Sequence, residues 1–133
     1  MKLTKTGTVR LKTAFLVLAA VLVSIIALLY GVNPAWFAAT FLGSDDLGVN
    51  VTHILRAVMC LYLALGVFWL VSAFNDRLRD PAILIVLLFA GGLFIGRMLS
   101  FAIDGQPAPL LIFYAGLELL VVPVAAWLYT RPE

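Results

Sequence analysis

The chain has 133 residues, of which 64% are hydrophobic and only 12% are charged, with a formal net charge of +2. A soluble domain of this length has roughly half apolar and about a quarter charged residues, so this composition excludes that class. The single cysteine also excludes a disulfide framework. With a mean hydropathy of +1.11, the class that fits is a small integral membrane protein.

The apolar residues form four blocks that polar turns separate. A helix needs about 20 predominantly apolar residues to cross a hydrocarbon core of roughly 30 Å. The runs are too long for the strands of a membrane barrel, and they lack a two-residue period. We therefore predict an all-α integral membrane four-helix bundle, with a single domain over residues 1–133. The predicted spans cover residues 13–32, 51–74, 81–103 and 109–129.

The first block begins after Lys12, and no charged residue occurs between Lys12 and Asp45. Its basic start resembles a secretory signal peptide, but about 20 apolar residues exceed a typical signal core, and no good cleavage site follows closely. We expect an uncleaved first helix. Residues 33–50 form the long connection, and Trp36 and Phe41 fit either a short amphipathic element at the membrane interface or a plain loop.

Small residues in the second and third blocks favour close helix packing. Gly92, Gly96 and Ser100 recur every four residues and form one stripe on the predicted third helix. That stripe either helps to position the neighbouring Arg97 within the bundle or forms a contact with a second copy of the chain. Gly66 in the second block is a further position at which another helix can approach closely.

The basic residues outside the four blocks all fall on one side of the predicted membrane. By the positive-inside rule, this asymmetry predicts that both termini are cytoplasmic and that the protein is a multi-pass protein of the bacterial cytoplasmic (inner) membrane. It also argues against a dual-topology transporter, which needs a weak bias. These residues are Lys2, Lys5, Arg10, Lys12, Arg77, Arg79 and Arg131.

Three charged residues lie inside the predicted spans: Arg56, Arg97 and Glu118. A charge at membrane depth costs a few kcal/mol on insertion scales, so such a residue usually has a partner or a function. At about 1.5 Å per residue, all three lie roughly 7–13 Å below the same outer surface, on three different helices. We predict that they meet in the interior of the bundle and form an intramembrane salt bridge.

Further polar residues occur three, four, six or seven positions from these charges. Offsets of three, four and seven place side chains on one face of a helix, so most of these residues extend a polar seam toward the outer surface. The sequence therefore predicts a cluster of polar groups around the three charges. We place Asp104 and His53 in the ligand-binding or ion-pair cluster itself, and the residues that support it are Tyr62, Ser100 and Tyr114.

Two arginines that face one glutamate leave an excess charge of +1 if His53 is neutral. Asp104 could fold inward and complete a second pair, water could solvate one guanidinium, or an anionic ligand could lie between the arginines. Guanidinium groups bind carboxylates and phosphates well, so a lipid head group or a small organic acid fits this site. The alternative is an internal ion-pair network that only fixes helix packing.

The polar residues of spans two to four and the turn before span four form a set of short motifs. They are Arg56, Tyr62 and Gly66, then Gly91-Gly92-Leu93, Gly96-Arg97 and Ser100, then Asp104-Gly105-Gln106-Pro107-Ala108-Pro109, and Glu118. Together they resemble the bacterial membrane family catalogued as domain of unknown function 4345, over about residues 32–128. The resemblance implies a four-helix membrane protein without an established activity, and it implies roles for Arg56, Arg97, Asp104 and Glu118.

Three functions remain open at this point. The first is a protein that holds a lipophilic or anionic amphiphile, such as a membrane lipid or another lipophilic small molecule, at Arg56, Arg97 and Glu118. The second is an accessory subunit that docks onto a larger membrane complex or a homo-oligomer, with a purely structural ion-pair cluster. The third is proton-coupled transport or an enzyme that depends on Glu118. We expect no metal site, no cofactor, no catalytic motif and no nucleic-acid partner, because the sequence offers no motif for them.

Overall fold

A computed structural model describes residues 4–44 and 46–133, and this part of the chain contains only helices and the turns between them. Four helices are long and apolar enough to cross a membrane, which confirms the predicted all-α four-helix membrane architecture. They are α1 (Lys5–Gly31), α3 (Gly48–Ala73), α4 (Arg79–Ile103) and α5 (Pro109–Tyr129).

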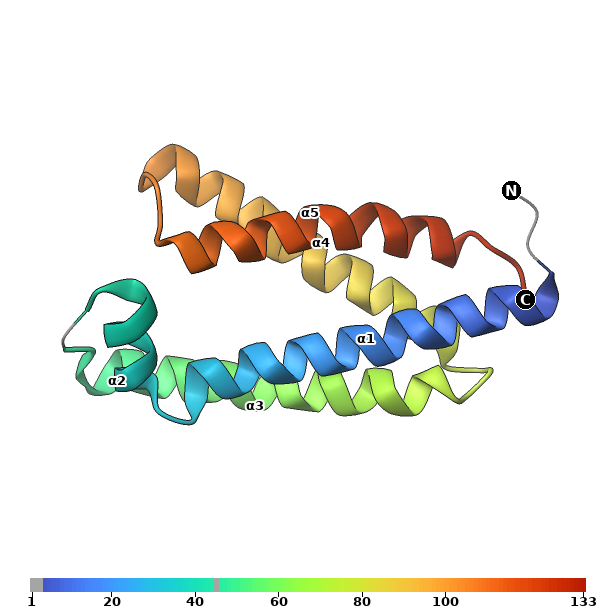
Figure 1. Cartoon of the computed structure of the whole chain (residues 1–133), viewed down its shortest axis with the longest axis horizontal. Coiled ribbons are helices and arrows are strands. Elements are labelled where there is room, and N and C mark those ends of the chain that lie inside the picture. The colour runs from blue at the N-terminus through green and yellow to red at the C-terminus, as the bar shows by residue number, and fades with distance from the viewer. Residues whose placement is uncertain (1–3, 45) are drawn as a thin grey trace.

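The four long helices form two antiparallel hairpins (Figure 1). Helix α1 packs mainly along α3, and α4 packs mainly along α5, whereas contacts between the two hairpins are fewer. In Figure 1 the hairpins converge toward the end where the C-terminus lies and diverge toward the opposite end. We call the converging end the basic end, after the charged residues described below, and the diverging end the far end.

Helix α1 begins eight residues before the predicted span, because Thr4 caps it. The Thr4 hydroxyl accepts a 3.0 Å hydrogen bond from the backbone N–H of Gly7, which satisfies one of the free donors of the first turn. Buried residues then recur every three or four positions along the helix, as expected for a helix that packs along one face. These residues are Thr8, Lys12, Leu16, Ala20, Val23, Ala27 and Tyr30.

The long connection contains two short helical segments, α2 (Pro34–Phe37) and the π-helix η1 (Ala38–Leu42). Asn33 caps α2 by accepting a 3.1 Å hydrogen bond from the backbone N–H of Trp36. Phe37 is 1% exposed, and its ring meets the ring of Tyr30 edge-on at 4.9 Å. This stretch is therefore a short helical element and not a plain loop, and it covers the end of α1.

Glycines allow α1 and α3 to approach closely at two levels. A side-chain carbon added at Gly66 would lie 2.8 Å from the Ser24 hydroxyl, which agrees with the close packing predicted there. At Gly31 such a carbon would lie 2.3 Å from the Met59 side chain, a close contact that the sequence analysis did not identify. Each glycine therefore fits a site that a larger residue would disrupt.

The glycine stripe on α4 packs against no other helix of the described chain. A side-chain carbon added at Gly92 or Gly96 would meet nothing within 4 Å, and Ser100 is exposed. The expectation that this stripe positions Arg97 by tight packing within the bundle is therefore wrong. The stripe faces outward together with large apolar side chains such as Leu88 and Ile95, which are 66% and 69% exposed.

At the basic end, a fully buried lysine connects three segments of the chain. Lys12 Nζ donates 2.6 Å hydrogen bonds to the carboxylate of Asp80 and to the backbone carbonyl of Arg131. These contacts join α1 to the start of α4 and to the residues that follow α5. From the sequence, Lys12 was visible only as a basic residue beside the membrane, because a lysine is buried only when partners approach it, here from distant parts of the chain.

A second buried cation lies nearby. Arg79 is 4% exposed, and its guanidinium donates to Asp76 at 2.8 Å and to the carboxylate of Glu133. Its Nε also donates to the backbone carbonyl of Ala73 at 3.3 Å. Two carboxylates and a carbonyl thus compensate one buried guanidinium, which is the arrangement that a buried charge requires.

Candidate functional site

Arg97 on α4 and Glu118 on α5 form an ion pair inside the membrane-spanning helices. Arg97 Nε donates a hydrogen bond to each carboxylate oxygen of Glu118, and both bonds are 3.0 Å long. The two side chains keep only 20% and 10% of their surface exposed. Arg97 lies six residues before the end of α4 at Ile103, so the pair is about 9 Å below that end of the helix. The predicted intramembrane salt bridge is therefore present between these two residues.

The pair uses only one of the three nitrogen atoms of the guanidinium. Because both hydrogen bonds start from Nε, the terminal amino groups take no part in the contact with Glu118. Arg97 Cζ also lies 5.7 Å from the centroid of the Tyr114 ring, within the range of a cation–π interaction. Helix α5 thus supplies both the counter-charge and an aromatic face, one helical turn apart.

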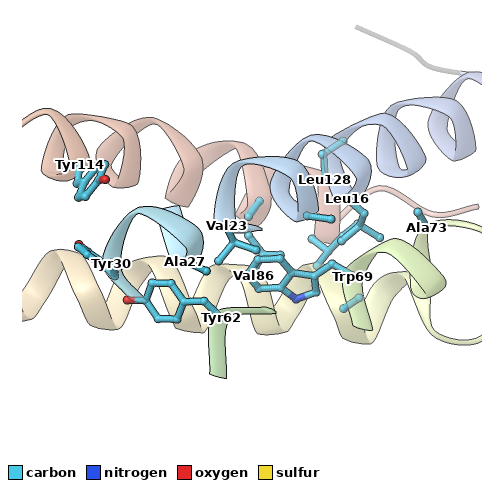
Figure 2. Close-up of a cluster of buried hydrophobic side chains, with 14 of the residues drawn as sticks. Leu16, Val23, Ala27, Tyr30, Tyr62, Trp69, Ala73, Val86, Tyr114 and Leu128 are labelled. Atoms are coloured by element: carbon cyan, nitrogen blue, oxygen red, sulfur yellow. The ribbon is translucent and has the colours of Figure 1, made fainter. Parts of the chain in front are cut away.

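Three tyrosines from three helices gather beside this pair. Tyr30 of α1 lies between Tyr62 of α3 and Tyr114 of α5, with ring centroids 6.2 and 6.0 Å apart (Figure 2). All three are buried. Tyr62 and Tyr114 are among the predicted supporting residues, whereas Tyr30 was not predicted. The available signal was its helical spacing from Val23 and Ala27, which lie on the same buried stripe.

A cavity of about 90 Å³ lies between the four long helices, next to the tyrosines. Its wall is almost entirely apolar, and Arg97 and Glu118 line it near the far end. Toward the basic end the wall includes Trp69 and Phe89, whose ring centroids are 5.5 Å apart. Along α1 the lining runs over residues 19–30, a length of about 16 Å. The site is therefore a narrow, partly open apolar cavity with a polar end.

Two buried polar atoms in the cavity wall have no hydrogen-bond partner within the described part of the chain. They are the hydroxyl of Tyr114 and the indole N–H of Trp69. Tyr114 is 4% exposed and Trp69 is 1% exposed. The great majority of buried donors in proteins are paired, and water in a membrane interior is scarce. The cavity wall thus carries unpaired hydrogen-bonding groups at two levels.

Arg56 does not join the pair, contrary to the expectation that all three charged residues meet. Its Nη1 donates a 3.0 Å hydrogen bond to the backbone carbonyl of Gly31, so it satisfies the C-terminal end of α1. His53 lies one turn away on the same exposed face, and both residues line a separate open pocket with Asp46 and Thr52. The sequence could not show this outcome, because a backbone carbonyl carries no signal in a charge pattern.

Asp104 also stays outside the cavity. It is exposed at the end of α4, where its carboxylate accepts a hydrogen bond from the Ser100 hydroxyl, and neither residue lines the cavity. The possibility that Asp104 folds inward to complete a second pair is therefore wrong. The helical offset from Arg97 placed these residues on a common face, but that face turns outward near the end of α4.

The observed arrangement changes the charge of the site. With Arg56 and Asp104 elsewhere, one arginine faces one glutamate, so the ionic side chains that line the cavity sum to zero. The excess positive charge that favoured an anionic ligand is absent from this cavity. Among the described residues, no three His, Cys, Asp or Glu side chains lie close enough to hold a metal ion. The chemistry that the wall offers is hydrogen bonding and apolar contact.

Comparison with protein families identifies the family to which the chain belongs. Residues 11–129 match the family described as a domain of unknown function (DUF4345), and since this match covers nearly the whole chain, the protein belongs to that family. Comparison with curated proteins and with solved structures gives no match.

Proposed function

We propose that this member of the DUF4345 family binds a lipophilic molecule inside the membrane. The polar part of the ligand would contact Arg97 and Glu118, and its apolar part would lie in the cavity beside Trp69. The observation that supports this function is one cavity that combines an apolar wall, an ion pair and unpaired buried donors. A ligand site of this kind usually combines apolar walls with a few placed polar groups. We assign the protein to the bacterial inner membrane by the same proposal.

The polar contact is available because Arg97 keeps its terminal amino groups outside the pair with Glu118. A purely structural ion pair gains most from a fork-to-fork geometry, in which two guanidinium nitrogens face the carboxylate. Here a single nitrogen faces both carboxylate oxygens. The N–H groups that Glu118 does not use can therefore donate to a ligand without breaking the pair.

A mass measurement on the purified protein tests this proposal. The protein would be extracted in a mild detergent and examined by native mass spectrometry, which reports bound lipophilic molecules as added mass. We expect one retained ligand per chain. Leu93→Phe adds volume at the cavity wall and should abolish retention, whereas Leu88→Phe makes the same change on the outward face of α4 and should keep it.

Equal retention by both variants would mean that the molecule adheres to the outer surface, and it would contradict the proposal. The absence of any retained molecule from the wild-type protein would contradict it as well. The folding of each variant would be checked by its circular dichroism and by its elution volume.

A second candidate is an accessory subunit that docks onto a larger membrane complex or onto another copy of the chain. The observation that favours it is the outward glycine stripe, where Gly92 and Gly96 leave open space beside α4. Small residues allow close helix contact in membranes. Gly96→Leu should then abolish a stoichiometric complex without lowering the stability of the isolated chain, whereas Leu120→Ala, on the exposed face of α5, should not.

A further inference from the structure

We infer that the cavity takes a single-chain amphiphile whose head group is small, uncharged and able to accept hydrogen bonds, such as a hydroxyl or a carbonyl. This inference rests on the proposed function and adds the chemical class of the ligand. It replaces the anionic head group that the charge arithmetic of the sequence favoured.

The first reason is the charge of the site. Arg97 is already neutralised by Glu118, and the hydrogen bonds between them are 3.0 Å long. An anionic head group that contacts the guanidinium also comes close to the Glu118 carboxylate, which repels it. Arg56, the other cation of the spans, is held at the carbonyl of Gly31 instead. A neutral acceptor gains a hydrogen bond here without that repulsion.

The second reason is the depth of the site. The ion pair lies about 9 Å from the end of α4 and about 13 Å from the start of α5. A phosphate or carboxylate head group would have to leave the membrane surface and lose its hydration to reach this level. A hydroxyl or carbonyl loses much less hydration, and Arg97 together with the Tyr114 hydroxyl offers partners that replace it.

The third reason is the shape of the cavity. A volume of about 90 Å³ extends beside residues 19–30 of α1, over about 16 Å. A long, narrow and partly open space of this kind fits one hydrocarbon chain better than a fused ring system or the paired chains of a phospholipid. The apolar wall continues past Leu93 and Phe89 toward Trp69, so the chain would extend from the ion pair toward the basic end.

Trp69 provides a direct reporter for this ligand. It is 1% exposed and lines the cavity, whereas Trp36 and Trp127 are 51% and 37% exposed. In a Trp36→Phe/Trp127→Phe variant excited at a wavelength that tyrosine does not absorb, the remaining tryptophan fluorescence comes from Trp69. Bromine atoms near the end of a bound hydrocarbon chain should quench that fluorescence.

The experiment compares two probes with the same brominated chain, a fatty alcohol and a fatty acid. The titration would be made in detergent micelles at about pH 9, well above the ordinary pKa of a carboxyl group. We expect the alcohol to reach half-maximal quenching at a concentration about tenfold lower than the acid, which corresponds to one hydrogen bond to a charged donor against a repelled carboxylate. Leu93→Phe should remove the quenching by the alcohol, and Leu88→Phe should not.

A charge variant tests whether repulsion by the Glu118 carboxylate causes the preference for the alcohol over the acid. Glu118→Gln removes the carboxylate and leaves Arg97 with a net positive charge. The fatty acid should then gain about tenfold in apparent affinity relative to the alcohol, because a charge-assisted hydrogen bond replaces a repulsion. If Glu118→Gln fails to fold, the wild-type protein would be titrated with a brominated alkyl amide of the same chain length. The amide is neutral and should bind like the alcohol, and an affinity as low as that of the acid would contradict the role of head-group charge.

The outcomes distinguish this inference from the proposed function. If the acid quenches Trp69 as well as or better than the alcohol, and Leu93→Phe removes both effects, the head-group assignment is wrong while binding in the cavity holds. If neither probe quenches Trp69 more than it quenches the Leu93→Phe variant, the cavity binds neither, and the proposed function fails.

Discussion

Replacement of Glu118 by leucine removes the counter-charge of Arg97 and both of its 3.0 Å hydrogen bonds to that residue. Removal of one partner from a buried ion pair costs about 3–5 kcal/mol, because the remaining charge stays desolvated. Arg97 keeps 20% of its side-chain surface exposed, so partial solvation relieves some of that penalty. We therefore expect Glu118→Leu to lower the free energy of unfolding by about 3 kcal/mol, the lower end of that range.

The matching double variant isolates the interaction energy between Arg97 and Glu118 from the contacts that each residue makes with its surroundings. Arg97→Met/Glu118→Leu removes both charges and replaces them with apolar side chains of similar size, which is often nearly neutral for a buried pair. We expect its stability to lie within about 1 kcal/mol of the wild type, and a coupling energy of at least about 2 kcal/mol between the two positions. The measurement is unfolding in mixed micelles with increasing amounts of sodium dodecyl sulfate, followed by circular dichroism.

Additive effects of the two single substitutions would refute this reasoning, because they would show that the residues do not stabilise each other. Arg77→Met is the matched control, since Arg77 is exposed in the turn before α4 and its side chain forms no ion pair among the described residues. Its substitution should change the free energy of unfolding by no more than about 0.5 kcal/mol.

Three further predictions concern stability and topology. Asp80→Asn removes the counter-charge of the fully buried Lys12 and should cost about 2–4 kcal/mol in the same unfolding assay, whereas Asp76→Asn, whose carboxylate is 91% exposed, should cost less than about 1 kcal/mol. Gly66→Ala should destabilise by about 1–3 kcal/mol through the contact with α1, whereas Gly92→Ala should be neutral or slightly stabilising, and the opposite order would contradict the packing. The positive-inside rule predicts a cytoplasmic C-terminus, so alkaline phosphatase fused to the C-terminus should be inactive and a fluorescent protein fused there should be fluorescent. An active phosphatase would show that the C-terminus lies on the opposite side of the membrane.

The membrane spans could be predicted from the sequence because their signal is local. Length and hydropathy identify about 20 consecutive apolar residues without knowledge of any partner. The fourth predicted span, residues 109–129, has the same bounds as α5, and the second and third differ from α3 and α4 by three residues or fewer at each end. The first differs by eight residues at its start, because the cap at Thr4 and the buried Lys12 extend the helix beyond the apolar run.

The candidate site was only partly predictable, since its contacts are not local. Arg97 and Glu118 could be paired because opposite charges at similar depth are visible in the sequence and both are costly alone. Arg56 could not be placed, because its partner is the carbonyl of Gly31, which exists as a free acceptor only where α1 ends. Tyr30 was missed because an aromatic residue near a helix end is equally typical of the membrane interface.

The polar contacts at the two ends of the bundle differ in what they connect. At the basic end, Lys12 of α1 binds Asp80 of α4, so a charged contact crosses between the hairpins. At the far end, the ion pair of Arg97 joins α4 to α5, and the hydrogen bond of Arg56 joins α3 to α1. Each of those contacts stays within one hairpin. Separation of the hairpins at the far end therefore breaks neither of them, whereas separation at the basic end breaks a buried ion pair.

This difference predicts that a ligand enters at the far end while the basic end acts as the pivot. Spin labels at Val32 and Ile103, which are 63% and 71% exposed, report the distance between the hairpins at the far end. Labels at Phe74 and Tyr129, which are 71% and 42% exposed, report it at the basic end. Addition of the fatty alcohol should shift or narrow the distance distribution of the first pair and leave that of the second unchanged. A larger change at the basic end would contradict the pivot, because the Lys12–Asp80 ion pair would then have to open during binding.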